Sequence, residues 1–86
     1  MKLVLKQMDV RSTSVCLGKK MCKILEKLGF QKAHQVGSHI RYVHPDGRKT
    51  VVPVHGNEEI GRGLLNEILK QVKLSREDYE KMRKEV

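Results

Sequence analysis

Two stretches of this chain carry apolar residues at helical spacing, and they lie on either side of three short segments that favour strands. The first stretch has a stripe at i, i+3, i+4 and i+7, formed by Met21, Ile24, Leu25 and Leu28. The second has a similar stripe, formed by Leu64, Leu65, Ile68, Leu69 and Val72. Such a stripe is the buried face of an amphipathic helix. The patterns predict one helix over Lys19–Leu28, ended by Gly29, and another from Gly61–Gly63 to Lys73.

The intervening part predicts an antiparallel meander of three strands. The three β-prone segments are Phe30–Val36, His39–Val43 and Lys49–Val54. Gly37 and Ser38 separate the first from the second, and His44-Pro45-Asp46-Gly47 has the residues of a type I turn before the third. Pro53 lacks an N–H group, so it marks an edge strand or the end of a strand.

The order of the elements predicts a two-layer α+β domain over residues 18–86. Ser75-Arg76-Glu77-Asp78 has the form of a capping box, so a short C-terminal helix completes the order α-β-β-β-α. A chain of 86 residues has room for one domain with a thin core. Double-stranded-RNA-binding domains share this order, as do other small α+β folds. Residues 1–17 are expected to form an N-terminal extension. It is an edge strand around Leu3–Lys6, where Leu3 and Leu5 alternate with Lys2, Val4 and Lys6, or a disordered arm, or the result of a mis-assigned start, since Met8 and Met21 lie downstream.

The charge of the chain is strongly basic and uneven. Lys and Arg number 18 against 10 Asp and Glu, which gives a net charge of +8. Residues 1–43 hold nine basic and two acidic residues, a net of +7, whereas residues 44–86 hold nine and eight. This excess favours a polyanionic partner, nucleic acid or an acidic protein, that meets mainly the first half. The alternative is that the lysines only keep a small protein soluble.

The sequence gives no sign of a membrane or secreted protein. No apolar run approaches the ~18–20 residues of a membrane span, and Met1–Met8 lacks the apolar core of a secretory signal. Two cysteines, Cys16 and Cys22, do not make a disulfide framework. We therefore expect a reduced, cytoplasmic protein.

Four lysines gather on the side of the first predicted helix that is opposite its apolar stripe: Lys19, Lys20, Lys23 and Lys27. Like charges at this spacing repel one another, and exposed helices usually mix signs. We therefore expect this face to contact phosphates. Arg62 stands at the start of the second long helix, where free backbone N–H groups also favour an anion. The alternative for Arg62 is a solvated side chain.

Among the four histidines, His39 is the strongest candidate for chemistry. It follows Gly37 and Ser38 at the start of a strand, where glycine lets a ligand approach the backbone. Strand alternation places His39 and Arg41 on one face. An imidazole takes or gives a proton near neutral pH, and a guanidinium holds a phosphate. RNA carries its own nucleophile, the 2′-hydroxyl, so this pair suits RNA cleavage; the plainer alternative is a hydrogen-bonded histidine at a strand edge.

The other histidines have weaker patterns. His55 lies in a strand-to-helix loop, where it either contacts phosphate or caps the loop. His44 is expected to bond to the backbone of its turn, and His34 has no distinguishing neighbour. The chain has no Cys-x-x-Cys or His-x-x-x-His pair, so we expect no metal site.

A series of short motifs occurs in a characteristic order between about Gly18 and Tyr79. They are Lys27-Leu28-Gly29-Phe30, Gly37-Ser38-His39, Tyr42, His44-Pro45-Asp46-Gly47-Arg48, Val52-Pro53-Val54-His55, Arg62-Gly63 and Ile68-Leu69-Lys70-Gln71. Their combined spacing resembles the HicA toxin family, the small ribonucleases of HicAB toxin–antitoxin systems.

The resemblance implies a double-stranded-RNA-binding fold that cuts mRNA without a metal or cofactor. It also implies a catalytic histidine in the Gly-Ser-His motif, which is His39 here. A cognate HicB antitoxin, often acidic, is expected to cover the site. The chain departs from the family at its N-terminus, because family members usually begin close to the first helix and about 17 residues precede it here.

The main hypothesis is therefore a toxin endoribonuclease in which His39 is the general acid or base for attack of the 2′-hydroxyl on the phosphodiester. The RNA-binding residues of this hypothesis are Lys19, Lys20, Lys23, Gly37, Ser38, Arg41 and Arg62. The first alternative is a non-catalytic RNA-binding module of the same fold. The second is a protein-interaction domain whose basic face binds an acidic partner.

Overall fold

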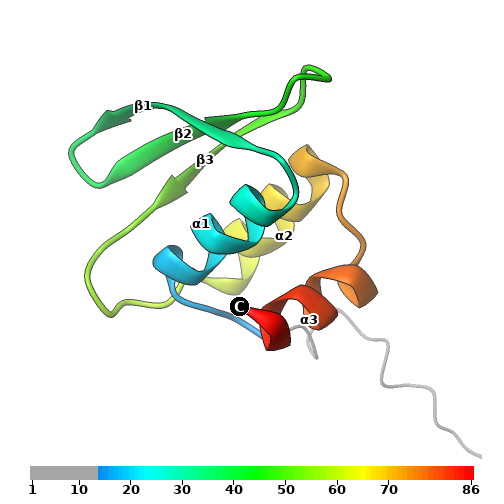
Figure 1. Ribbon diagram of the computed structural model, residues 1–86. Coiled ribbons are helices and arrows are strands. Elements are labelled where there is room, and N and C mark those ends of the chain that lie inside the picture. Colours follow the sequence, from blue (N-terminus) through cyan, green and yellow to red (C-terminus); the bar gives the residue numbers. More distant parts are fainter. Residues whose placement is uncertain (1–13) are drawn as a thin grey trace, which may run out of the picture.

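Helices and strands follow one another in the predicted order. The computed structural model describes residues 14–86. Its elements are α1 (Gly18–Lys27), β1 (Gln31–Val36), β2 (His39–Val43), β3 (Lys49–Pro53), α2 (Arg62–Val72) and α3 (Arg76–Glu85) (Figure 1). The strands form an antiparallel sheet in the order β1-β2-β3. The predicted α+β fold of the double-stranded-RNA-binding type is confirmed.

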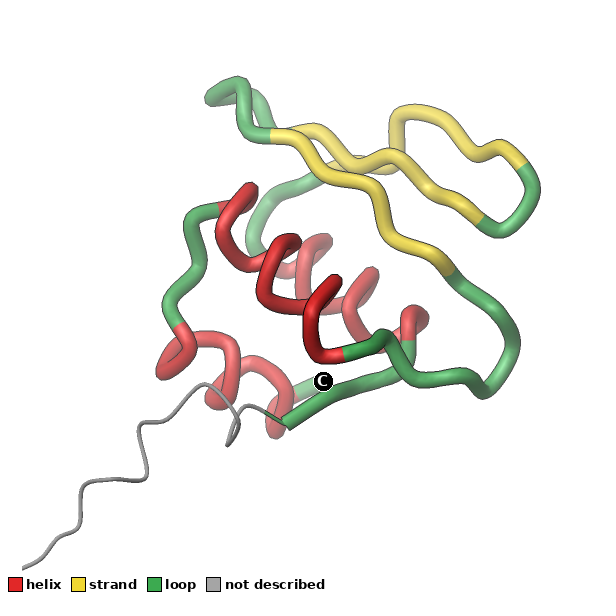
Figure 2. The backbone as a smooth tube through the Cα atoms, turned by 180° about the vertical axis from the view of Figure 1, so that it is seen from behind, coloured by secondary structure: helices red, strands yellow, loops and turns green. Residues whose placement is uncertain are grey.

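The helices lie on one face of the sheet, and α1 and α2 lie side by side beneath it (Figures 1 and 2). Both helices pack against β3, and α3 packs against α1. The largest fully buried side chains of this layer are Met21, Ile24, Leu25, Tyr42, Val52, Leu65, Ile68, Val72 and Tyr79. The two predicted apolar stripes thus supply much of the core.

Side chains alternate between the two faces along β2. Ile40 and Tyr42 are buried on the helix side, whereas His39 and Arg41 are exposed on the outer side. The predicted sharing of a face by His39 and Arg41 is confirmed. All six residues of β1 are exposed.

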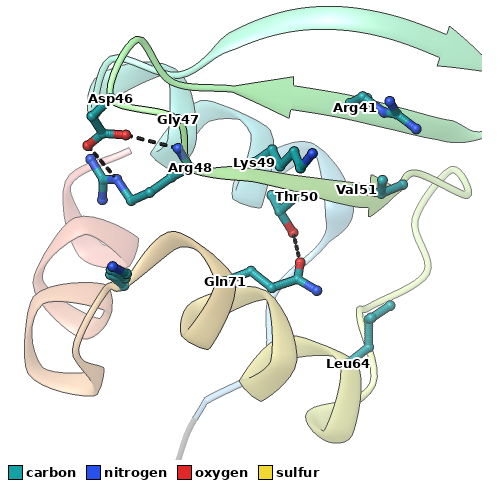
Figure 3. A pocket seen from close by; sticks show the side chains of 10 residues that line it. Arg41, Asp46, Gly47, Arg48, Lys49, Thr50, Val51, Leu64 and Gln71 are labelled. Atoms are coloured by element: carbon teal, nitrogen blue, oxygen red, sulfur yellow. Dashed lines mark hydrogen bonds and ion pairs between the residues drawn. The ribbon is translucent and has the colours of Figure 1, made fainter.

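Two apolar residues lie elsewhere than the sequence pattern predicts. Phe30 precedes β1 rather than opening it, because its N–H donates to the Leu25 carbonyl at the end of α1 and its ring enters the core. Leu64 belongs to the predicted stripe of α2, but it is 43% exposed. It lies on the flank of α2 that the edge of β3 leaves uncovered (Figure 3).

Residues 14–17 are tied to the C-terminal half of the domain. The Ile60 N–H donates to the Cys16 carbonyl at 2.9 Å, and Leu17 forms a β-bridge with Glu59. The buried Tyr79 hydroxyl donates to the Ser14 carbonyl at 2.6 Å. The proposed strand around Leu3–Lys6 lies outside the described residues.

The predicted cap of α3 is present, since the Ser75 hydroxyl accepts from the Asp78 N–H at 3.1 Å. Cys16 and Cys22 are free thiols, both buried. Within residues 14–86, no helix is long and apolar enough to cross a membrane.

Candidate functional site

Segments that are distant in the sequence meet at one end of the domain, where β1 turns into β2. The Val54 N–H donates to the Ser38 carbonyl at 2.7 Å, which places the end of β3 beside this turn. Gly18, the first residue of α1, packs directly on the backbone of Pro53 and Val54. Residues 18–20, 37–39, 53–56 and 61–62 are called the histidine end below.

His39 is the first residue of β2 and lies in register with Val36 on one side and Pro53 on the other. Its side chain is exposed on the outer face of the sheet. Gly37 has φ +57°, a left-handed conformation that glycine adopts without strain, and this reverses the chain just before the histidine. The pairing on both sides fixes the backbone of His39, while the turn leaves its ring open to solvent.

His55 faces His39 from the loop that follows β3. The two ring centroids are 6.1 Å apart, and the ring planes are perpendicular. His55 Nε2 lies 3.3 Å from the Ser38 hydroxyl. From the sequence, His55 had two possible roles, phosphate contact or capping of its loop. The hairpin register that pairs His39 with Pro53 would have placed His55 beside His39.

The cationic residues divide between the histidine end and the flank of α1. Lys19 and Lys20 stand in the first turn of α1, next to Gly18, and Lys23 follows one turn later on the exposed side. Arg62 opens α2 and is exposed. The bonds of residues 16 and 17 to residues 59 and 60 hold the two helix starts together.

Both helix starts present backbone N–H groups at the histidine end. Among the described residues, neither the Leu17 nor the Gly61 cap position supplies a side-chain hydrogen bond to its helix. The first N–H groups of a helix carry partial positive charge and favour an anion. The helix starts thus add to the charge of Lys19, Lys20 and Arg62.

Arg41 lies two residues along β2 from His39 and pairs with Val51 of β3. It also lines a hollow between β3 and α2 (Figure 3). Arg41 therefore stands between the histidine end and this hollow. Its other neighbour in the register is His34 of β1.

His44 belongs to the opposite end of the domain. Its Nδ1 accepts from the Asp46 N–H at 3.1 Å, as predicted for a residue bonded to its turn, and its ring packs edge-on against Phe30. The Arg48 N–H and guanidinium hold the pKa of Asp46 below its usual range. These contacts build the turn between β2 and β3 rather than a reactive site.

The cysteine thiols and tyrosine hydroxyls of the described residues are protonated at neutral pH. Burial raises the pKa of the Cys16 and Cys22 thiols. Burial also raises the pKa of Tyr42 and Tyr79 far above its usual range. Residues 14–86 hold no group of three or more His, Cys, Asp or Glu side chains arranged for a metal ion. The histidine end brings two exposed imidazoles together.

Fold and site together define a small basic α+β domain of the double-stranded-RNA-binding type. A family described as the HicA toxin of bacterial toxin–antitoxin systems matches residues 18–74, more than half of the chain. The chain belongs to the HicA toxin family and is accordingly a toxin with an antitoxin partner. A search among curated proteins gives no match.

Proposed function

We propose that this toxin is an endoribonuclease that cuts mRNA in the cytoplasm without a metal ion, with His39 and His55 as its proton-transfer residues. The observation that carries the proposal is the pair of exposed imidazoles with ring centroids 6.1 Å apart, at the end of the domain that also holds Lys19, Lys20 and Arg62. An imidazole reaches a substrate atom over a hydrogen bond of about 3 Å. Two rings at this separation are close enough to contact one phosphodiester.

Binding would use the charges around the two rings. Lys19, Lys20 and Lys23 would hold the RNA backbone along α1, and Arg62 would hold it at the start of α2. Arg41 would hold the phosphate next to the scissile bond from the outer face of the sheet. Because Gly37 has no side chain, the backbone of the turn would admit the RNA strand closely.

The reaction would be an internal transphosphorylation. One imidazole takes the proton of the 2′-hydroxyl, and the oxygen bonds to the adjacent phosphorus. The bond from phosphorus to the 5′-oxygen breaks, and the other imidazole, in its protonated form, gives a proton to that oxygen. The products are a 2′,3′-cyclic phosphate and a 5′-hydroxyl. Ser38 would orient His55 through the 3.3 Å contact with Nε2.

His39→Ala tests the proposal on single-stranded mRNA. General acid–base catalysis is worth about 10²–10⁴-fold, so we expect a loss of that size in the cleavage rate. His34→Ala is the matched control, because His34 is an exposed strand histidine two residues from the same turn. If folded His39→Ala cleaves as fast as His34→Ala, the assignment of His39 is wrong.

The dependence of the rate on pH tests the second imidazole. A general acid and a general base acting together predict a bell-shaped profile for the parent protein, and His55→Ala should remove one limb. Analysis of the RNA ends should find the cyclic phosphate. A protein that binds RNA with strong salt dependence but leaves it intact would instead be the non-catalytic module.

A further inference from the structure

The hollow between β3 and α2 surrounds the free edge of the sheet. Its lining includes Arg41, Lys49 and Val51 from the sheet and Leu64, Gln71 and Lys73 from the helix side (Figure 3). Arg41, Lys49 and Val51 belong to the outer face, whereas the buried Thr50, which donates to Gln71 at 2.6 Å, belongs to the inner face. A hollow lined from both faces of the sheet has the edge of β3 at its centre.

The backbone of β3 presents unpaired groups to this hollow. Alternate residues of an antiparallel strand bond to the neighbouring strand, and those between them point outward. The Val54 N–H donates to the Ser38 carbonyl, and the Arg48 carbonyl accepts from the His44 N–H. The backbone N–H and C=O groups of the even-numbered residues of β3 therefore point toward β2. The N–H and C=O groups of Val51 therefore point away from β2. Such an edge is a template for another strand.

Apolar side chains flank this edge. Val51 is 39% exposed and Leu64 is 43% exposed, and both line the hollow. The sequence pattern places Leu64 in the buried stripe of α2, yet the described chain covers it only in part. Covering both side chains would remove apolar surface from water, which favours a partner with apolar residues at this point.

The rim of the hollow is basic. Arg41, Lys49 and Lys73 line it, while Asp46 is already paired with Arg48 through a 2.8 Å contact. A second copy of this chain would bring the same positive charges against these, and the net charge of +8 opposes that pairing. RNA would suit the cations, but its binding is dominated by phosphate contacts, which leave the outward C=O of Val51 and the apolar Leu64 side chain unmatched. An acidic peptide satisfies all three features.

We propose that an extended acidic segment of the antitoxin binds in this hollow and adds a fourth strand next to β3. Its backbone would bond to the N–H and C=O of Val51, an apolar side chain would lie between Val51 and Leu64, and its carboxylates would face Lys49 and Lys73. Pro53 has no N–H group, so it ends the bonding edge on the side of His39. This docking does not depend on ribonuclease activity.

The test uses the full chain and a labelled seven-residue peptide of alternating glutamate and valine, with its ends blocked. Fluorescence anisotropy should show binding that weakens with salt, and amide shifts should centre on Val51 and Leu64. Val51→Pro removes the outward N–H, which does not bond to β2, together with the valine side chain that contacts the peptide, and should weaken binding at least tenfold. Lys49→Glu should do the same, whereas Lys81→Glu, the same charge change on α3, should not.

If Val51→Pro fails to fold, Leu64→Ser still tests the proposal, because Leu64 is exposed. It should weaken binding of the peptide without lowering the melting temperature. Unchanged affinity in Val51→Pro and Leu64→Ser would overturn the proposal. So would a concentration-dependent dimer that Val51→Pro abolishes, or an RNA oligonucleotide whose binding Lys49→Glu weakens more than that of the peptide. His39→Ala should bind the peptide like the parent protein, which separates this result from the cleavage assay.

Discussion

Gly18→Ala and Gly63→Ala are the same substitution in the first turns of two helices, but they should change stability in opposite directions. A methyl group at Gly18 would lie well inside 3.0 Å of the Pro53 carbonyl oxygen and within 3.1 Å of the Val54 Cα. Both neighbours are backbone atoms, so they yield only if α1 moves away from the sheet. At Gly63 the same methyl group meets nothing within 4 Å.

The expected magnitudes follow from these contacts. Overpacking against a fixed backbone costs about 1–3 kcal/mol, and replacing a helical glycine by alanine returns up to about 1 kcal/mol. Gly18→Ala should therefore lower the free energy of unfolding by about 1.5 kcal/mol, or Tm by about 6–12 °C. Gly63→Ala should raise the free energy of unfolding by about 0.5 kcal/mol, because only the helix preference changes.

Thermal and urea melts followed by circular dichroism measure both effects. Gly18→Ala should also weaken RNA binding in the folded protein, since α1 carries Lys19 and Lys20 to the histidine end. If Gly18→Ala were as stable as Gly63→Ala, the close packing of α1 on the end of β3 would be refuted. The placement of Lys19 and Lys20 beside His39 would then be wrong as well.

Ser75→Ala removes the hydroxyl that accepts from the Asp78 N–H, and urea melts should show a loss of about 1 kcal/mol. Tyr79→Phe leaves the Ser14 carbonyl without its donor and should cost about 1–1.5 kcal/mol; an unchanged midpoint would mean that water replaces the hydroxyl. Burial alone would raise the pKa of Glu80, but hydrogen bonds from Ser14 and a guanidinium outweigh it and lower the pKa. A lowered folded pKa gives stability that is present above about pH 4.5 and lost on acidification, so Glu80→Gln should flatten the fall in urea midpoint between pH 7 and pH 3.

Much of the fold was predictable because it is encoded locally. The apolar stripes of α1 and α2 are read from spacing alone, and the turn before β3 from its proline and glycine. Strand alternation likewise placed His39 and Arg41 on one face. These features depend on a few neighbouring residues, so tertiary packing did not alter them.

What the sequence did not predict depends on contacts between distant segments. Leu64 has the spacing of a core residue, but it is partly exposed because the sheet ends at β3. His55 lies in a loop without periodicity, and only the register of β2 with β3 brings its ring near His39. The hollow between β3 and α2 exists only once α2 packs beneath the sheet.

Because β1 is exposed, its local stability should be lower than that of the rest of the sheet. Its six residues contribute no buried side chain, and in the sheet it pairs with β2 alone. Opening of this strand breaks hydrogen bonds but uncovers little of the core, so it needs much less free energy than global unfolding. Amide hydrogens of β1 should therefore exchange with solvent long before those of the Ile40–Val52 pair. The turn at Gly37 would move with β1, while Ser38, bonded to the Val54 N–H, and the buried Ile40 would stay with β3 and the core.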